Sequence, residues 1–239
     1  MTRLLRLTGT ALIAAGVLVL AWTAVVWRWQ DPFSALYTHV QQGRLESRYD
    51  ERAEAYRPPT VARGDLASVR QALAVDARAY RRSLHRGDAV GRLRIGRIGL
   101  DMVVVQGTDD ATLKKGPGHY STTGLPGEGR LVYVAGHRTT YLAPFSHIDD
   151  IREGDYARLE LPYGTFTYRV ARHYVVGEHD LRVLADRGVE VLRLQACHPR
   201  FFASHRYIVD ARLVSIEPRG GRAYDVAGPV AASVRAASS

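Results

Sequence analysis

The chain has 239 residues, enough to bury one core of moderate size, and its 46% hydrophobic and 24% charged content is ordinary for a globular protein. Its net charge is +9, yet only two of its 33 basic residues are lysines, and it contains no recognition-type helix and no run of five basic residues. We therefore expect no nucleic-acid binding, and we expect the charge to favour anionic lipid or wall polymers instead.

The N-terminus contains an uncharged, apolar run from Leu7 to Trp27, long enough to cross a bilayer as a helix. Trp22, Trp27 and Trp29 lie toward its distal end, as interfacial aromatic residues do. We predict a cytoplasmic segment over residues 1–6, an uncleaved plasma-membrane signal anchor over 7–27, and the rest of the chain outside the membrane. A cleaved signal peptide is the alternative, but its apolar core is usually only about 7–15 residues long.

Residues 28–90 are predicted to form a partly helical stalk. The polar segment over 31–63 carries a proline pair, Pro58–Pro59, that breaks any long helix. Residues 65–84 then predict a helix, with Asp65 as its N-cap and apolar residues at near-helical spacing. Because the apolar stripe is narrow, this helix either packs on the surface of the following domain or belongs to the stalk.

Residues 91–217 are predicted to form an all-β domain. Short runs rich in β-branched and aromatic residues are separated by Gly, Pro or Asp, with one short helix expected over 109–116. This pattern predicts a closed or nearly closed β-barrel. The tail over 218–239 loses hydrophobic periodicity and is predicted to be disordered. The seven runs cover residues 92–100, 101–107, 130–137, 155–161, 165–176, 189–197 and 206–216.

The sole cysteine, Cys197, closes one of these runs and has no partner for an internal disulfide. A buried small hydrophobe and an intermolecular bridge are the readings without chemistry. However, His137 also follows a strand, and Arg206 opens the run after Cys197. A hairpin with an eight-residue loop, 198–205, would place Cys197 opposite Arg206. A thiol, an imidazole and a fixed cation at one barrel rim suit acyl transfer, because they supply a nucleophile, a proton carrier and an oxyanion partner.

The segments "VAGHRTTY" and "LQACHPRFFASHR" together resemble the signature of the sortase family, and "GRLRIGRIGLDMVVVQGTDDATLKKGPGHY" resembles its first strands and following helix. The resemblance covers residues 91–216. Within the family, "CHP", "GHRTTY" and "KGPGHY" are most similar to class E sortases, which are common in high-GC Gram-positive bacteria. The resemblance implies an eight-stranded barrel, one strand more than the seven runs.

The resemblance also implies an activity: a membrane-anchored cysteine transpeptidase. Such an enzyme cleaves the Thr–Gly bond of a C-terminal sorting signal in a secreted protein, forms a thioacyl intermediate, and transfers the protein to an amine of a lipid II-type peptidoglycan precursor. Cys197 would be the nucleophile, His137 the general acid and base, and Arg206 the oxyanion stabiliser. Tyr120 would lie in the signal pocket, where a class E tyrosine accompanies a preference for LAxTG over LPxTG.

The chain departs from the family pattern at Ala196, where many sortases place a threonine before the cysteine. One lost donor of this kind costs about 2.7–4 kcal/mol, so rate or specificity is affected rather than the reaction class. Ala196, Thr139 and His198 are further candidate substrate contacts. Asp109 and Asp110 are expected to cap the short helix, and we expect no metal and no other cofactor.

Two other classes of function fit parts of the sequence. One is a different extracytoplasmic Cys/His enzyme, such as an L,D-transpeptidase or a papain-like wall peptidase. The former places its histidine just before the cysteine, and the latter places its cysteine on a helix N-terminus ahead of the histidine. Here His137 precedes Cys197 by 60 residues, and both follow strands. The other class is an anchored, non-catalytic β-barrel binding module, which alone would tolerate loss of the thiol.

Overall fold

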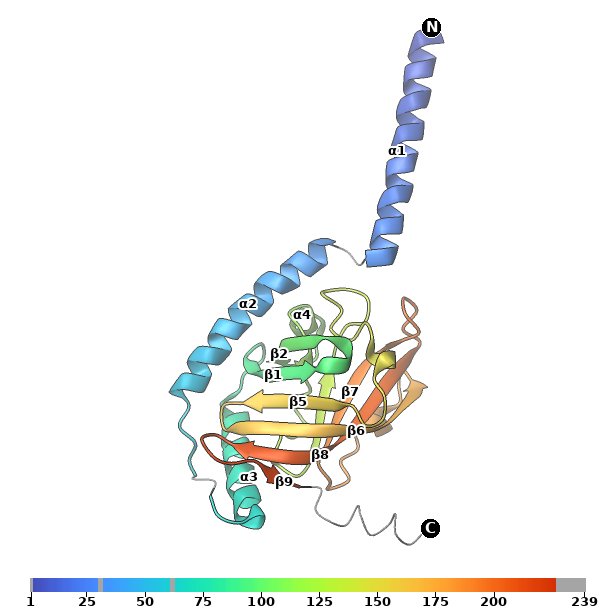
Figure 1. Ribbon diagram of the computed structural model, residues 1–239. Coiled ribbons are helices and arrows are strands. Elements are labelled where there is room, and N and C mark those ends of the chain that lie inside the picture. Colours follow the sequence, from blue (N-terminus) through green and yellow to red (C-terminus); the bar gives the residue numbers. More distant parts are fainter. Residues whose placement is uncertain (1, 30–31, 61–62, 227–239) are drawn as a thin grey trace.

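Eight β-strands close into a barrel in the computed structural model, which describes residues 2–29, 32–60 and 63–226 (Figure 1). The strands follow the order β6-β5-β1-β2-β3-β4-β7-β8, and β8 pairs with β6 to close the ring. A ninth, short strand adds to β8 outside the ring. The strands are β1 (Ala89–Ile95), β2 (Leu100–Gln106), β3 (Gly118–His119), β4 (Leu131–Ala135), β5 (Tyr156–Leu161), β6 (Gly164–Gly177), β7 (Val191–His198), β8 (His205–Pro218) and β9 (Tyr224–Asp225).

The eighth barrel strand that the seven runs did not include is β3. It has two residues, which is too short to show an alternating pattern, and it bridges β2 in parallel and β4 in antiparallel pairing. The predicted short helix is present as α4 (Asp110–Leu113), and the Asp109 carboxylate caps it by accepting hydrogen bonds from two backbone N–H groups. Three short 3-10 helices lie in the connections: η1 (Gly96–Ile98), η2 (Ile148–Asp150) and η3 (Leu181–Leu184).

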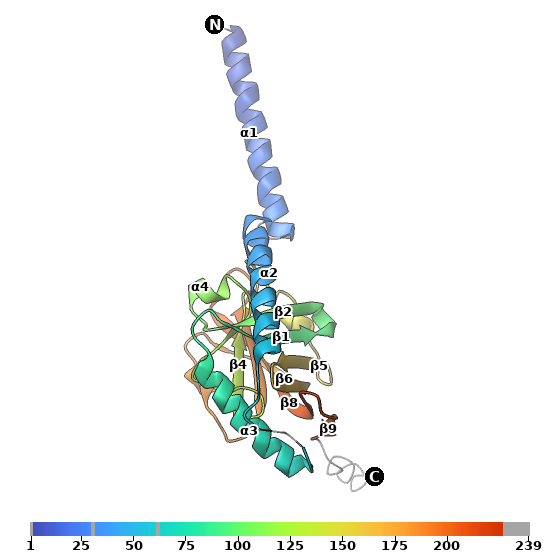
Figure 2. The same ribbon diagram turned by 90° about the vertical axis from the view of Figure 1, so that its left-hand side faces the viewer.

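Helix α3 (Leu66–Ser83) packs against the barrel, the first of its two predicted alternatives (Figure 2). Asp65 caps its N-terminus by accepting a hydrogen bond from the Ser68 N–H at 2.8 Å. Leu73 and Tyr80 are at most 1% exposed and share one core with the inward side chains of the barrel strands. The narrow apolar stripe is thus enough to cover one flank of the barrel.

Helix α2 (Pro32–Ala55) differs from the predicted stalk, because it lies along β1 and β2. The Gln42 side chain donates to the Val103 carbonyl at 3.0 Å and accepts from the Val103 N–H at 2.8 Å, so it binds β2 as a neighbouring strand would. Leu45 and Tyr49 are buried against the same two strands. Most other positions of α2 are polar, so its sequence lacks the continuous apolar stripe that indicates a packed helix.

Helix α1 (Thr2–Trp29) projects away from the barrel (Figure 1). Its stretch Arg6–Thr23 is long and apolar enough to cross a membrane, and none of it is buried against the rest of the described chain.

At the other end of the chain, the prediction of disorder is wrong for the first part of the tail. Strand β9 pairs with Ser215 and Ile216 of β8, and the Tyr224 hydroxyl donates to the Gly64 carbonyl at 3.0 Å. Residues 227–239 of the predicted tail lie outside the described residues.

Candidate active site

The parallel pairing of β4 with β7 brings two of the candidate catalytic residues to one edge of the barrel. Ala135 lies opposite Gln195, and the Gly136 N–H donates to the Gln195 carbonyl at 3.0 Å. His137 and Cys197 each follow this last pair by two residues. Because side chains alternate along a strand, both continue the face that Ala135 and Gln195 occupy.

The hairpin of β7 and β8 adds the cation. Cys197 is directly paired with Arg206, as the hairpin interpretation predicts, so the two side chains lie on one face about 5 Å apart at their Cβ atoms. The loop is shorter than the predicted eight residues. His198 still pairs with His205, which leaves only residues 199–204 to connect the strands.

His137, Cys197 and Arg206 line one cavity of about 380 Å³ on the outer surface of the barrel. Alternation along β7 explains its position, since Leu194 and Ala196 point into the barrel core. Outward residues of β4 and β7 form the floor, η3 forms one wall, and α4 with the residue after β3 forms the other. The floor and wall residues are Tyr133, Ala135 and Gln195, Leu181, Val183 and Leu184, and Leu113 and Tyr120.

The His137 imidazole is set up to accept a proton. Partial burial lowers its pKa, an effect that the Lys114 charge reinforces and the Asp110 charge opposes, so the ring is neutral at neutral pH. Its Nε2 atom is buried and makes no hydrogen bond with any residue that the structure describes. The Tyr141 ring lies against the imidazole, with 5.2 Å between centroids, and fixes one side of it.

The Arg206 guanidinium is held by the loop that precedes it. Its Nη1 donates to the Ala203 carbonyl at 2.6 Å and to the His205 carbonyl at 2.9 Å, while Nη2 lies 3.8 Å from a carboxylate oxygen of Glu178. Among the residues that the structure describes, Glu178 at this long distance is the one ionic partner of Nη2, so this nitrogen can donate to an incoming carbonyl oxygen. Glu178 was not among the predicted site residues, and it comes from the loop after β6.

Of the predicted substrate contacts, two reach the cavity and two do not. Tyr120 lines it, with its ring edge-on to Tyr133 at 6.1 Å. Ala196 also borders it, although its side chain is 1% exposed and packs inside the barrel. Thr139 and His198 are half-buried and lie outside the cavity. Thr139 lies outside because the chain turns away after His137. His198 lies outside because it continues β7 beyond Cys197 and pairs with His205.

Arg138, the neighbour of His137, is a buried residue that the sequence interpretation missed. Its side chain is 3% exposed and lies 2.6 Å from an Asp149 carboxylate oxygen. Its Nη1 donates to the Cys197 carbonyl at 3.2 Å and lies 2.9 Å from Nδ1 of His198. One cation therefore joins the segment after His137 to the end of the thiol strand. An arginine beside an exposed-looking turn gives no sequence signal of such burial.

A second buried cation holds the wall of the cavity. Arg193 pairs with Asp210 through two hydrogen bonds, of 2.6 and 2.8 Å, and also donates to the Val183 carbonyl in η3. Burial raises the pKa of Asp210, but hydrogen bonds and charge from Arg193 and Arg172 outweigh it, and the net pKa is lowered. The carboxylate thus stays ionised and keeps η3 attached to the barrel.

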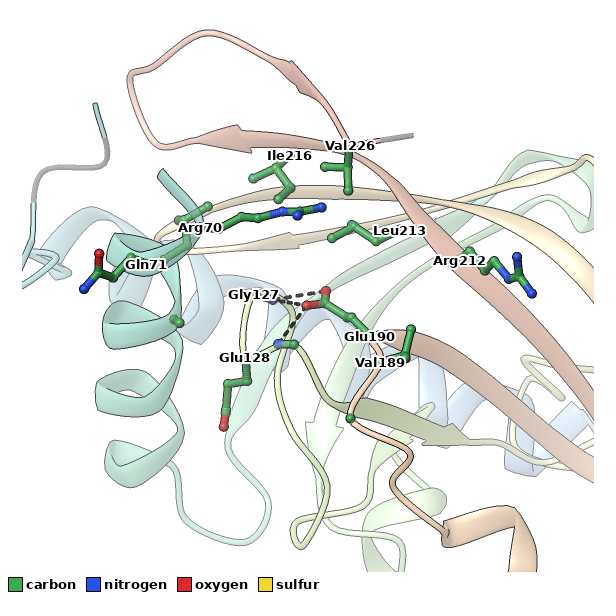
Figure 3. Close-up of a pocket in the computed structure, with 14 residues that line it drawn as sticks. Arg70, Gln71, Gly127, Glu128, Val189, Glu190, Arg212, Leu213, Ile216 and Val226 are labelled. Atoms are coloured by element: carbon green, nitrogen blue, oxygen red, sulfur yellow. Dashed lines mark hydrogen bonds between the residues drawn. The ribbon is translucent and has the colours of Figure 1, made fainter. Parts of the chain in front are cut away.

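A larger cavity, of about 540 Å³, lies between α3 and β8 at the opposite end of β7 (Figure 3). A half-buried residue in its wall, Glu190, accepts hydrogen bonds at its carboxylate from the Gly127 and Gly129 N–H groups at 3.1 Å and from the Tyr168 hydroxyl at 2.7 Å. Burial raises the pKa of Glu190. These partners hold the carboxylate against the loop before β4, and the residues that line this cavity include no thiol, hydroxyl or lysine amine.

A pH test follows from His119, which is buried beside Tyr120. Its Nδ1 lies 2.8 Å from the Gln106 side-chain oxygen, its Nε2 lies 2.9 Å from the Gly124 carbonyl, and burial lowers its pKa from 6.5 to about 4. Between these two pH values the unfolded chain binds a proton at His119 that the folded chain does not bind. The free energy of unfolding therefore falls by roughly 3 kcal/mol in all as pH is lowered from about 6.5 to about 4. We expect His119→Gln to flatten denaturant-unfolding free energy across this range. Curves for the two proteins that run parallel would contradict this assignment.

The Arg138 contacts predict a large effect from a single substitution. Arg138→Gln removes the ion pair with Asp149 and the donor to the Cys197 carbonyl. Because Asp149 is 46% exposed and stays hydrated, we expect the free energy of unfolding to fall by about 1–2 kcal/mol, mainly through the carbonyl left without its donor. Arg152→Gln, an exposed change nearby in the chain, should alter it by less than about 0.5 kcal/mol. Chemical denaturation measures both. Equal small effects would show that Arg138 does not hold the two segments together.

Comparisons with known proteins agree with this geometry. The model of the sortase domain family matches residues 93–214, about half of the chain. Sortase D of Bacillus subtilis (strain 168) is 34% identical over 133 residues, and the match spans 54% of this chain and 66% of that protein, just under two thirds of its length. The structure of sortase E from Streptomyces avermitilis is similar at 32% identity and a TM-score of 0.52, over 58% of this chain and 97% of that one. A Clostridium perfringens sortase D5 transpeptidase shares the fold, with 22% identity and a TM-score of 0.59 over 73% and 99%. The chain belongs to the sortase family of cysteine transpeptidases.

Proposed function

We propose that this protein is a membrane-anchored sortase of the class E type that joins secreted proteins to the cell wall. The observation that carries the proposal is the meeting of His137, Cys197 and Arg206 in one cavity at the ends of three strands. The substrate would be a secreted protein with a C-terminal LAxTG- or LPxTG-type signal. The acceptor would be the amine of a lipid II-type precursor.

In the proposed first step, the Cys197 thiol attacks the carbonyl carbon of the signal's threonine. The neutral His137 imidazole takes the thiol proton, and Arg206 donates hydrogen bonds to the oxygen that becomes negative. The imidazolium then returns that proton to the glycine nitrogen as the C–N bond breaks. The products of this step are a thioacyl enzyme and a free C-terminal fragment with a new amine.

In the second step, the acceptor amine attacks the thioester carbonyl and His137 removes its extra proton. The C–S bond breaks, the thiolate regains a proton from the imidazolium, and the secreted protein is amide-linked to the acceptor. The apolar walls formed by η3 and α4 would exclude water from the thioester and so favour the amine over hydrolysis.

The proposed location is the plasma membrane, with a single span. Helix α1 supports this, since its apolar stretch would serve as the anchor, residues 1–6 would lie in the cytoplasm and the barrel outside. Tyr120 in the cavity wall and the similarity to a sortase E support the class E type.

Ligation of peptides tests the catalytic assignment. We expect the full-length protein in detergent to join an LAxTG peptide to a short amine through the threonine, as read by mass spectrometry. Cys197→Ala and His137→Ala should abolish the product, and Arg206→Gln should lower kcat/KM by about 100- to 1,000-fold. Arg212→Gln, on the same strand but away from the cavity, serves as the control. Product formation by Cys197→Ala would remove the thiol from the mechanism and leave a binding module as the better interpretation.

Substitution of Tyr120 tests the signal preference. An alanine at the signal's second position has a backbone N–H that can donate a hydrogen bond to the Tyr120 hydroxyl oxygen, whereas a proline has no N–H. Because one hydrogen bond contributes about 1 kcal/mol, we expect Tyr120→Phe to reduce the preference for LAxTG over LPxTG by about fivefold in kcat/KM. The measurement is direct competition of the two peptides for one acceptor amine. An unchanged ratio would assign the preference to another part of the cavity.

A further inference from the structure

Two adjacent phenylalanines stand exposed in the loop that joins β7 and β8. Phe201 is 63% exposed and Phe202 is 80% exposed, the latter being the most exposed large hydrophobic side chain in the described part of the chain. The loop begins two residues after Cys197, and neither ring lines the catalytic cavity. Neither the barrel core nor the cavity therefore accounts for this apolar pair, and an adjacent exposed pair of this size points to an external partner.

The loop also holds an unfavourable backbone conformation. Phe201 has φ of 72° and Ala203 has φ of 53°, values in the left-handed region that side chains other than glycine rarely adopt. The loop thus exposes both rings to solvent, and it holds Phe201 and Ala203 in backbone conformations that cost free energy on folding. Such a combination fits a contact made outside the folded chain better than a structural role.

The start of helix α2 shows which surface lies nearby. The Tyr141 N–H donates to the Ser34 hydroxyl at 3.2 Å, and the Thr38 hydroxyl donates to the Lys114 carbonyl at 2.9 Å. Tyr141 in turn contacts His137. The first turns of α2 are therefore fixed to the active-site end of the barrel, the end that also carries the loop joining β7 and β8 (Figure 1).

Chain length then limits how far this end can lie from helix α1. Ser34 follows Trp29, the last residue of α1, by five residues, which span at most about 18 Å when fully extended. If α1 crosses the bilayer, the active-site rim lies close to the membrane surface.

We propose that Phe201 and Phe202 insert into the lipid headgroup region and seat the active site on the bilayer. This inference rests on the membrane anchor of the proposed function. Aromatic rings are favoured at the boundary between headgroups and acyl chains. The same rim carries Arg200 but also the exposed carboxylates of Asp149 and Asp150, so the contact is apolar rather than electrostatic and requires no anionic lipid.

A fluorescence measurement on the full-length chain tests this contact. Cys197→Ser removes the sole thiol, and Ser204→Cys then places an NBD label in the loop while keeping both phenylalanines. In phosphatidylcholine vesicles we expect blue-shifted emission that doxyl-labelled lipid quenches. Val189→Cys, 61% exposed at the opposite end of β7, is the matched control and should show neither effect. Replacing both rings, Phe201→Ser with Phe202→Ser, should abolish the shift and quenching at position 204.

Each other outcome has a distinct meaning. If the protein floats with the vesicles but position 204 behaves like position 189, the lipid contact is overturned while the anchor stands. If the label responds to an added signal peptide and not to doxyl lipid, the rings bind peptide and the inference is wrong. Failure to float overturns the anchor and the inference together. Absence of peptide ligation by the unlabelled chain that keeps Cys197, with quenching intact in the labelled chain, would refute the proposed reaction alone.

Discussion

The parallel hydrogen bonding between β4 and β7 is the constraint on which the site depends. Five residue pairs, from Leu131–Val191 to Ala135–Gln195, fix how far each strand has run when it reaches the rim. Their inward apolar side chains fill the barrel, so a slip of one residue in either strand would expose the core face of that strand and turn its own candidate catalytic residue, His137 or Cys197, toward the interior. The hydrophobic core therefore sets the registration of the proposed base and nucleophile, although neither residue belongs to it.

Buried arginines hold the two segments around the cavity whose positions the strand pairing does not determine. The segment after β4 and the η3 wall are both irregular, and each is attached by one guanidinium, Arg138 or Arg193, that spans a carboxylate and a backbone carbonyl. Such buried pairs contribute little net stability relative to apolar packing, but breaking one is costly because a charge is left without its partner. Their geometric demand makes them suited to holding two loops in one arrangement around the cavity. The arginine-rich composition of the chain thus has a use within the domain.

Local patterns in the sequence predicted the parts of the fold that are themselves local. Strand runs, the Asp65 and Asp109 caps and the pairing of Cys197 with Arg206 follow from alternation, capping chemistry and hairpin geometry. Strand β3 was not predicted because two residues are too few to show an alternating pattern. Helix α2 escaped because it binds the barrel through a glutamine amide and a few apolar side chains rather than a continuous stripe. The positions of Arg138 and Glu178 at the site were not predicted, because their contacts form only when loops distant in the sequence come together.

The alternation of β7 also revises the expected importance of Ala196. Its side chain packs in the barrel core, whereas the Cys197 and Gln195 side chains face the cavity. A threonine at 196 would direct its Cβ substituents toward that core, where a hydroxyl needs an internal partner to offset its burial. The absence of a threonine hydroxyl at position 196 therefore affects the cavity less than the family pattern implies. The outward side chain nearest the thiol on its strand is Gln195, whose oxygen accepts a hydrogen bond from the Tyr133 hydroxyl. Its amide N–H groups donate to no residue in the described part of the chain and lie on the cavity floor. Of these two neighbours on the thiol strand, the one that presents a polar side chain to the cavity is residue 195 rather than residue 196.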